Sequence, residues 1–247
     1  MKIVEHELQI PSDYQYKALR EGGLLQRQWH RNRLLLVKNI NFLSENDDAA
    51  DIGCGSGNIV LVFSGKTKTF TGLDYNQESL DFLKGKVGER GIGNVNVNYF
   101  DLLNSDFSEF KGKFDKIILN EVIEHFEEEE VDHVMSNLHG LLKDGGEILI
   151  TTPNYVSAWP VMEFLADKFK IFPTLWGEQH KIKFTRKLLR NYCEKHDYEV
   201  MEMGTFGLIS PFAIILSRKL ADKFMELEAR HLSVLGPQLF VRIRNKK

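Results

Sequence analysis

The sequence predicts an α/β fold in which a doubly wound, mostly parallel sheet carries helices on both faces. From about residue 49, short apolar runs alternate with longer segments of helical pattern. Five apolar runs occur before residue 154, and the segments between them are long enough to cross from one parallel strand to the next. Strands that are buried on both faces have this continuous apolar character. Ligands in such sheets bind beyond the carboxyl ends of the strands.

The five predicted strands, in chain order, are AADIG, TFTGLD, VNVNYFD, KIILN and EILITTP. Helical patterns follow the first, second and fourth of these strands, whereas a turn-rich stretch follows the third. Before the first strand, residues 24–43 place apolar residues at helical spacing and predict an amphipathic helix. The acidic run at residues 127–130 fits the first turn of a helix, because carboxylates there complement the helix dipole.

The regular alternation weakens after Pro153. Residues 154–183 are rich in aromatic side chains and predict a lid-like insertion after the fifth strand. The pattern then indicates a helix and strand in FTRKLLRNYCEKHDYEVMEMGTF, a helix in SRKLADKFMELEARHL and a final strand in LFVRIR. We therefore expect one domain, with an N-terminal helical cap at 1–44, a cofactor-binding core at 45–153, the insertion, and a C-terminal segment at 184–247 that completes the sheet.

Composition argues against a nucleic-acid-binding, a disulfide-rich or a membrane-spanning protein. The formal charge of −3 argues against nucleic acid as a partner, although the N-terminal segment is locally basic. Two cysteines, Cys54 and Cys193, imply no disulfide framework. The N-terminus lacks the apolar core of a signal peptide, and the longest apolar stretch, residues 208–216, is about half of the roughly 20 residues that span a bilayer. We expect a cytoplasmic protein without a transmembrane segment, with residues 208–216 as a buried segment or a pocket lid.

A glycine-rich turn, DIGCGSGN, occupies residues 51–58 directly after the first predicted strand. Glycines at 53, 55 and 57 let the backbone turn sharply and approach a ligand where the next helix begins. Dinucleotide enzymes use a related turn, with the spacing G-x-G-x-x-G. The glycine spacing alone therefore leaves the ligand open.

Carboxylates follow the next two strands. Asp74 in GLDYN is placed to accept hydrogen bonds from two ribose hydroxyls, which fits a nicotinamide cofactor equally well. Asp101 in YFDLL is placed to accept from an adenine amine, while Tyr75, Phe100 and Leu102 contact the faces of the base. Three successive strand ends thus offer a backbone cradle, a ribose acceptor and an adenine acceptor, and the simplest ligand is an adenosine with a compact tail that carries no phosphate.

The set DIGCGSGN, GLDYN, YFD, FDKIILNEVIEHF, LLKDGGEILITTPN and HKIKFT resembles the class I S-adenosylmethionine-dependent methyltransferases over roughly residues 45–200. The resemblance implies a Rossmann-like, seven-stranded sheet whose last strand runs antiparallel. It also implies S-adenosylmethionine as the cofactor. The implied cofactor-binding residues are Asp51, Gly53, Cys54, Gly55 and Gly57 for the methionine moiety, Asp74 for the ribose, Tyr75, Asp101 and Leu102 for the adenine, and Asn120 with Glu121 for the sulfonium side.

Candidates for the chemistry of transfer lie in NEVIEHF and GEQHKIKFT. Glu121, Glu124 and His125 form an E-x-x-E-H group, and His180 follows in the later half. Two carboxylates and two imidazoles form a plausible octahedral site for a divalent metal such as Mg²⁺ or Mn²⁺. The pattern is similar to that of the small-RNA 3′-end 2′-O-methyltransferases and of the ubiquinone-pathway O-methyltransferases. Many family members without a metal also carry a Glu and a His here. A metal site and a metal-free pocket are therefore both hypotheses.

Without a metal, the catalytic candidates are His125 as general base, then His180, with Glu121 beside them. The leading hypothesis is methyl transfer to a small-molecule acceptor, at oxygen, with an aromatic or lipid-like acceptor suggested by the aromatic insertion. Metal-dependent RNA 2′-O-methylation, non-catalytic S-adenosylmethionine binding and a nicotinamide dehydrogenase are the alternatives. The sequence predicts neither the identity of the acceptor nor the oligomeric state.

Overall fold

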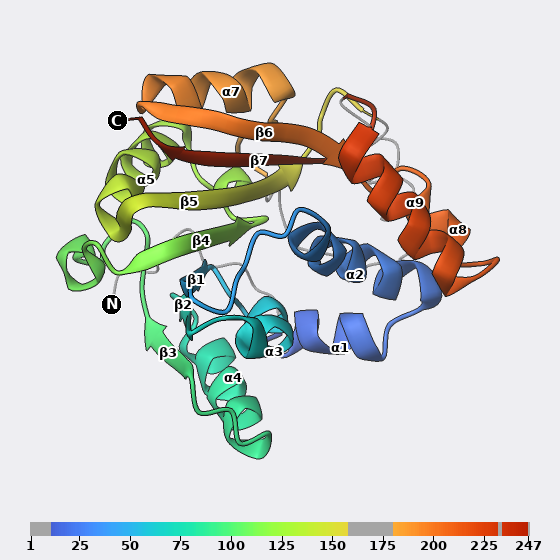
Figure 1. Cartoon of the computed structure of the whole chain (residues 1–247), viewed down its shortest axis with the longest axis horizontal. Helices are drawn as coiled ribbons and strands as arrows, with labels where there is room; N and C mark the ends of the chain where they lie inside the picture. Colours follow the sequence, from blue (N-terminus) through green and yellow to red (C-terminus); the bar gives the residue numbers. More distant parts are fainter. Residues whose placement is uncertain (1–10, 158–179, 232–233, 247) are drawn as a thin grey trace.

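The computed structural model describes residues 11–157, 180–231 and 234–246, and contains a seven-stranded sheet in the order β3-β2-β1-β4-β5-β7-β6 (Figure 1). The strands are β1 (Asp48–Ile52), β2 (Thr69–Asp74), β3 (Val95–Tyr99), β4 (Phe114–Asn120), β5 (Leu142–Pro153), β6 (Tyr198–Phe206) and β7 (Gln238–Asn245). β7 runs antiparallel to both β5 and β6, whereas the pairings among β1 to β5 are parallel. The predicted Rossmann-like sheet with an antiparallel last strand is confirmed.

Helices cover both faces of this sheet. They are α1 (Tyr14–Arg20), α2 (Leu24–Asn39), α3 (Asn58–Phe63), α4 (Gln77–Glu89), α5 (Glu128–Leu141), α7 (Arg186–Lys195), α8 (Ser210–Ala213) and α9 (Arg218–His231). Three short 3₁₀ helices, η1 (Ser64–Lys66), η2 (Phe107–Phe110) and η3 (Ile123–His125), lie in the connections. The predicted helix near residues 24–43, the final helix and the final strand are confirmed as α2, α9 and β7.

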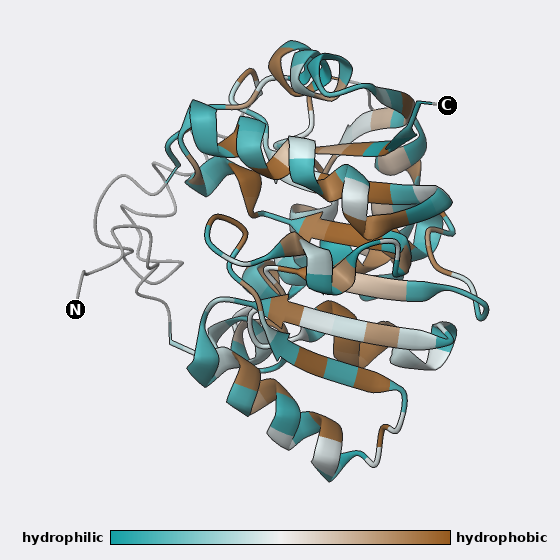
Figure 2. Cartoon of the chain, turned by 90° about the vertical axis from the view of Figure 1, so that its left-hand side faces the viewer, coloured by the Kyte–Doolittle hydropathy of each residue, from teal (hydrophilic) through white to brown (hydrophobic). Residues whose placement is uncertain are grey.

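Two apolar cores, one on each face of the sheet, hold these layers together. Ala50 and Ile52 of β1 pack into the core under α5 and α7, whereas Ala49, the residue before Ala50, packs into the core under α2, α3, α4 and α9. This alternation follows from the period of two in a strand. Because both faces of the central strands are covered, β4 and β5 carry unbroken apolar runs at residues 117–119 and 148–150, whereas the edge strand β3 alternates apolar and polar residues. Figure 2 shows the brown segments gathered along the central strands, with more teal on the helices outside.

Local sequence explains where several helices begin. Glu127 and Glu130 form a reciprocal capping box at the start of α5, so the acidic run at 127–130 opens a helix as predicted. Asn76 caps α4 and Thr185 caps α7, each by accepting a backbone N–H from three residues further on.

Most of the predicted insertion at 154–183 falls on residues 158–179, which lie outside the described residues. The lid assigned to it, and the division of the chain into cap, core, insertion and completing segment, stay predictions. Among the described residues, no helix has the length and apolarity needed to cross a bilayer.

Helices α2, α8 and α9 form a layer that is joined by polar side chains (Figure 1). Gln28 donates to Asn32 at 2.9 Å, and Asn32 donates to the Ser210 hydroxyl at 2.9 Å, with all three side chains buried. Arg31 on the neighbouring face of α2 forms two hydrogen bonds to Asp222 of α9, at 2.9 and 2.7 Å. The helices are therefore fixed relative to one another by directional contacts as well as by apolar packing.

A buried carboxylate, Glu228 of α9, anchors the turn between β6 and α8. Its two oxygens accept four consecutive backbone N–H groups at 2.6 to 3.0 Å, those of Gly207, Leu208, Ile209 and Ser210. Hydrogen bonds to a charged acceptor are the stronger kind, so this turn has a fixed conformation.

Candidate functional site

The predicted glycine turn lies between β1 and α3 and contains three glycines with positive φ, Gly53, Gly55 and Gly57. A Cβ atom on Gly57 would come within 2.3 Å of a Leu83 methyl carbon, and one on Gly53 within 2.5 Å of a Val122 methyl carbon. Left-handed backbone and close packing both require glycine here. These two requirements explain why glycine occupies these positions of the turn at the carboxyl end of β1.

Two carboxylates lie beneath this turn. Asp74 accepts the backbone N–H of Gly55 at 2.7 Å and that of Asn76 at 2.8 Å. Asp51 is only 2% exposed, and among the residues that the structure describes its Oδ1 atom has no hydrogen-bond partner. Burial, and then the nearby charge of Asp74, raise the pKa of Asp51 to about 8. Burial also raises the pKa of Asp74. An unpartnered buried carboxylate oxygen fits a ligand that brings an ammonium group.

The raised pKa of Asp51 predicts a pH dependence of the cofactor-free protein. The folded state holds this proton more tightly than the unfolded state, so the stability contributed by the protonated group is present below pH 4 and is lost as pH rises toward 8. The Asp51→Asn variant should therefore gain free energy of unfolding over the wild type by about 1 kcal/mol per pH unit between pH 5 and 7. Urea titrations of both proteins measure this, and parallel pH profiles would contradict it.

Asp101 lies after β3, the strand next to β2 at the edge of the sheet. Its carboxylate accepts the Leu103 backbone N–H and the Asn104 side-chain amide, each at 2.8 Å. These contacts fix the turn in which Leu102 is buried, and Tyr75 is half-buried after β2. Because β3, β2 and β1 are neighbours in the sheet, the structure places the three predicted carboxylates, Asp51, Asp74 and Asp101, at the ends of adjacent strands.

Helix α1 packs directly against the glycine turn, a contact that the sequence does not predict. The Tyr16 backbone N–H donates to the Ser56 hydroxyl at 2.8 Å, and the Asn58 amide donates to the Gln15 carbonyl at 2.6 Å. Arg20 donates to the other end of the Asn58 amide at 2.8 Å. Ser56 and Asn58 belong to the glycine motif, but the local sequence pattern does not predict that residues 15–20 contact them.

The end of β4 begins the second half of the site. Glu121 has a positive φ of 57°, which is rare for a residue with a side chain. Its carboxylate accepts from Arg33 of α2 at 3.1 Å and from the Thr151 hydroxyl at 2.9 Å. The same hydroxyl lies 3.0 Å from the Asn120 amide oxygen. Asn120 and Glu121 are therefore held at the sheet edge by β5 and by a helix from the N-terminal region.

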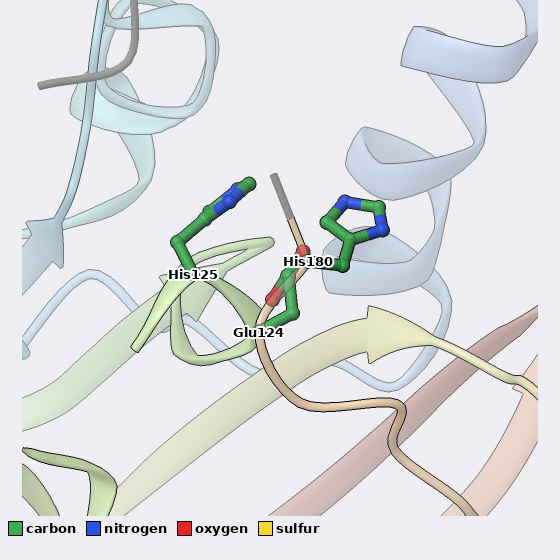
Figure 3. A group of neighbouring side chains, drawn as sticks. All are labelled: Glu124, His125 and His180. Carbon is green, nitrogen blue, oxygen red and sulfur yellow. The ribbon is translucent and has the colours of Figure 1, made fainter. Parts of the chain in front are cut away.

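Glu124, His125 and His180 come together after β4, with ligand-type atoms within 4.8 Å of one another (Figure 3). The Lys181 backbone N–H donates to the Glu124 carbonyl at 2.8 Å, and this contact brings the later segment onto η3. The Tyr155 hydroxyl lies 2.6 Å from Nδ1 of His180. Four residues were predicted here, and the structure groups three of them.

Glu124 is the most enclosed member of this group, at 1% exposed, and its Oε2 atom has no partner at hydrogen-bond geometry within the described ranges, although the Thr152 side chain lies nearby. Burial, and then the charge of Glu121, raise the pKa of Glu124 well above its ordinary value. Glu121 itself lies against Arg33 and outside the group of three. Cys54 is buried in the glycine turn, with its thiol against Gly72 of β2.

Comparisons with known proteins identify similar sequences and folds. The family described as "Methyltransferase domain" matches residues 50–148. EEF1A lysine methyltransferase 2 of Danio rerio is 30% identical over 121 residues, covering 46% of this chain and 51% of that protein. A ubiquinone biosynthesis O-methyltransferase of Actinobacillus pleuropneumoniae is 25% identical, covering 62% and 66%. The chain spans about half or less of the length of several relatives, among them (S)-coclaurine N-methyltransferase of Papaver somniferum, of which it covers 30%.

Solved structures share the fold across most of the chain. Magnesium protoporphyrin IX methyltransferase from Synechocystis PCC 6803 superposes with a TM-score of 0.62 at 14% identity, covering 94% of each chain. The methyltransferase domain of the bacterial CtHen1 protein gives a TM-score of 0.56 at 19% identity, covering 89% of this chain and 98% of that one. Residues 50–148 therefore match a methyltransferase domain, and the chain shares its fold with solved methyltransferases.

Proposed function

We propose that this protein transfers a methyl group from S-adenosylmethionine to an oxygen atom of a small-molecule acceptor. The observation that carries the proposal is the arrangement of Asp51, Asp74 and Asp101 at three adjacent strand ends, with the unpartnered oxygen of Asp51 beside the glycine turn. When bound, S-adenosylmethionine supplies an electrophilic methyl group on a sulfonium. Its adenine amine, ribose hydroxyls and ammonium group correspond to an adenine acceptor, a ribose acceptor and a buried carboxylate at the ends of three adjacent strands.

Each carboxylate has a separate task in this proposal. Asp51 pairs with the ammonium of the methionine moiety, which replaces the missing partner of its Oδ1 atom. Asp74 accepts from the ribose hydroxyls with the lone pairs that remain beside its two backbone bonds. Asp101 accepts from the adenine amine, with Tyr75 and Leu102 against the base. The glycine turn, with Cys54 inside it, keeps the backbone close to the tail.

The groups after β4 serve the acceptor. The leaving thioether needs no acid, so the protein must align the acceptor oxygen, exclude water and receive the acceptor's proton. His125 is the proton acceptor in this scheme. His180, whose ring lies against the Tyr155 hydroxyl, orients the acceptor or takes the proton in its place. Glu121 and Asn120 line the sulfonium side, and Arg33 fixes the Glu121 carboxylate.

Calorimetry and a transfer assay test the proposal together. Binding of S-adenosylmethionine and S-adenosylhomocysteine is measured first. The labelled methyl group is then followed into a catechol, a long-chain hydroxyaryl compound and a short RNA in parallel reactions. We expect transfer to a small hydroxylated acceptor and none to RNA. Binding with no transfer in any reaction would favour a non-catalytic cofactor-binding protein, and absence of binding would contradict the cofactor assignment.

Replacing His125 tests the proton acceptor. The His125→Gln variant should lower the rate of methyl transfer about 100-fold, because a positioned base contributes factors of this size, while affinity for S-adenosylhomocysteine stays unchanged. His133→Gln, an exposed histidine on α5, is the matched control and should retain full activity. An equal loss in the two variants would exclude a special role for His125.

A second candidate is a transfer assisted by a divalent metal, and the group of Glu124, His125 and His180 favours it. A carboxylate oxygen without a partner and two imidazoles form a donor set that suits Mn²⁺, which would lower the pKa of an acceptor hydroxyl. Titration of Mn²⁺ into the cofactor-free protein should then show one site, weakened at least about 10-fold by Glu124→Gln. Glu121→Gln separates a three-residue from a four-residue site. No binding, or binding that Glu124→Gln leaves intact, would overturn this candidate.

A further inference from the structure

The segment from α8 to the start of α9 carries a concentration of exposed apolar side chains. Ile209, Phe212, Ile215 and Leu216 are 45%, 51%, 67% and 78% exposed, and all four fall within eight consecutive residues. We call these four side chains the α8 tip. Exposed apolar side chains are normally scattered singly, so a group of four on one short segment indicates a surface that contacts something other than water. The apolar stretch at 208–216, expected as a buried segment or a pocket lid, is thus divided: Ser210, Pro211 and Ala213 are buried, whereas the four side chains of the α8 tip are exposed.

Basic side chains follow the α8 tip immediately. Arg218 and Lys219 occupy the first turn of α9, and Lys223 lies one turn further, all three exposed. Cations at a helix N-terminus are disfavoured by the helix dipole, so helix stability does not explain them. In the described part of the chain, these three side chains form no ion pair, whereas the acidic neighbours Asp222 and Glu226 are already paired with Arg31 and Arg230.

The protein holds this surface in a fixed shape. Glu228 binds the backbone of residues 207–210, and Ser210 at the start of α8 accepts from Asn32 of α2. The α8 tip therefore projects from a rigid base. Since β6 runs parallel to β1 through β5, the segment after it leaves the same edge of the sheet as the glycine turn and the acidic residues of the site.

We propose that the α8 tip docks on an anionic lipid bilayer. The apolar side chains enter the boundary between headgroups and acyl chains, and Arg218, Lys219 and Lys223 contact the lipid phosphates. Charge complementarity selects this partner: the molecule carries −3 overall, yet the charges beside its exposed apolar group are positive and unpaired within the described residues. The orientation places the site's edge of the sheet toward the membrane. Docking stands apart from the proposed methyl transfer, because it does not depend on a bound cofactor.

Co-sedimentation of the full chain with lipid vesicles tests the proposal. One vesicle contains phosphatidylcholine alone, and the other contains phosphatidylcholine with about one third phosphatidylglycerol. We expect binding to the anionic vesicle that falls as salt rises, because each basic residue near an anionic surface contributes roughly five-fold to the partition. The double variant Lys219→Glu/Lys223→Glu should lose at least about 25-fold on this basis. The double variant Ile215→Ser/Leu216→Ser should lose at least about 10-fold.

Matched controls make the result specific. Lys84→Glu/Lys111→Glu changes the net charge equally at exposed positions of other elements, and Val62→Ser removes an exposed apolar side chain from α3. Both controls should bind anionic vesicles as the wild type does. Binding of S-adenosylhomocysteine, measured on every variant, reports folding and tests the cofactor site separately. No binding by the wild type, or equal losses in the controls, would overturn the proposal, as would a dimer in light scattering that Ile215→Ser/Leu216→Ser converts to a monomer.

Discussion

The Asp74→Asn variant should bind S-adenosylmethionine roughly 100-fold more weakly than the wild type, a loss of about 3 kcal/mol. The substitution keeps the shape of the side chain but removes the charge that would strengthen the hydrogen bonds proposed between Asp74 and the ribose hydroxyls. The two carboxylate oxygens of Asp74 accept the backbone N–H groups of Gly55 at 2.7 Å and Asn76 at 2.8 Å. In the Asp74→Asn variant one of these oxygens becomes an NH₂ group, which is a donor and would face one of the two N–H groups. Isothermal titration calorimetry measures the change.

Asp106→Asn is the control for this measurement. Asp106 also accepts a backbone N–H, that of Ser108 at 2.8 Å, at the start of η2, and it is exposed. A general effect of losing such a turn contact would lower the thermal midpoint of both variants. Only Asp74→Asn should change the affinity. Equal affinities in the two variants would remove Asp74 from the cofactor site.

The Glu228→Ala variant should lose at least about 3 kcal/mol of unfolding free energy. Four backbone N–H groups between β6 and α8 would lose their acceptor at once, and two of these contacts, those of Gly207 and Ser210, are buried. The Ser210 hydroxyl would also lose a contact, which weakens the polar connection from α2 to α8. Urea denaturation followed by circular dichroism measures the loss.

Glu226→Ala, two residues earlier on the same helix, provides the comparison. Its carboxylate is exposed and pairs with Arg230 at 2.9 Å, one turn away. Pairs of this kind on a helix surface contribute about 0.3 to 0.5 kcal/mol. The two substitutions remove the same side chain from the same helix, so the difference between them isolates burial and backbone contacts. A Glu228→Ala cost below 1 kcal/mol would mean that water replaces the carboxylate.

Much of the fold follows from local sequence, because apolar runs and the strand period of two determine which residues form the sheet and which core each residue enters. Apolar runs such as KIILN are buried on both faces, and the alternation of Ala49 and Ala50 between the two cores needs only the strand period. The positions of Asp51, Asp74 and Asp101 at one edge follow from the same argument, since the carboxyl ends of parallel strands meet there. The glycine turn is equally local, because it depends on backbone angles that few other residues adopt.

The contacts that complete the site join residues that are far apart in the sequence, so local patterns do not predict them. Arg33 reaches Glu121 across 88 residues, and Asn32 reaches Ser210 across 178. No periodicity encodes such pairs, because they depend on where whole helices pack after the sheet has formed. For the same reason the sequence places Glu121, Glu124, His125 and His180 in one group, whereas the packing of α2 draws the Glu121 carboxylate to Arg33. The exposure of the α8 tip also depends on how the helices pack, because apolar content alone does not tell a buried segment from an exposed one.

The polar layer of α2, α8 and α9 has a consequence for the order of events during synthesis. Arg31 and Asp222 are separated by 191 residues, so at ordinary elongation rates α2 waits roughly 10 to 40 s for its partner. Strands β1 to β5 are all made in that interval and can pair first. A nascent chain halted before α9 would expose Gln28, Asn32 and the apolar side chains of α2 together. We expect such a chain to bind chaperones, and the protein to resist proteolysis only once α9 has been released from the ribosome.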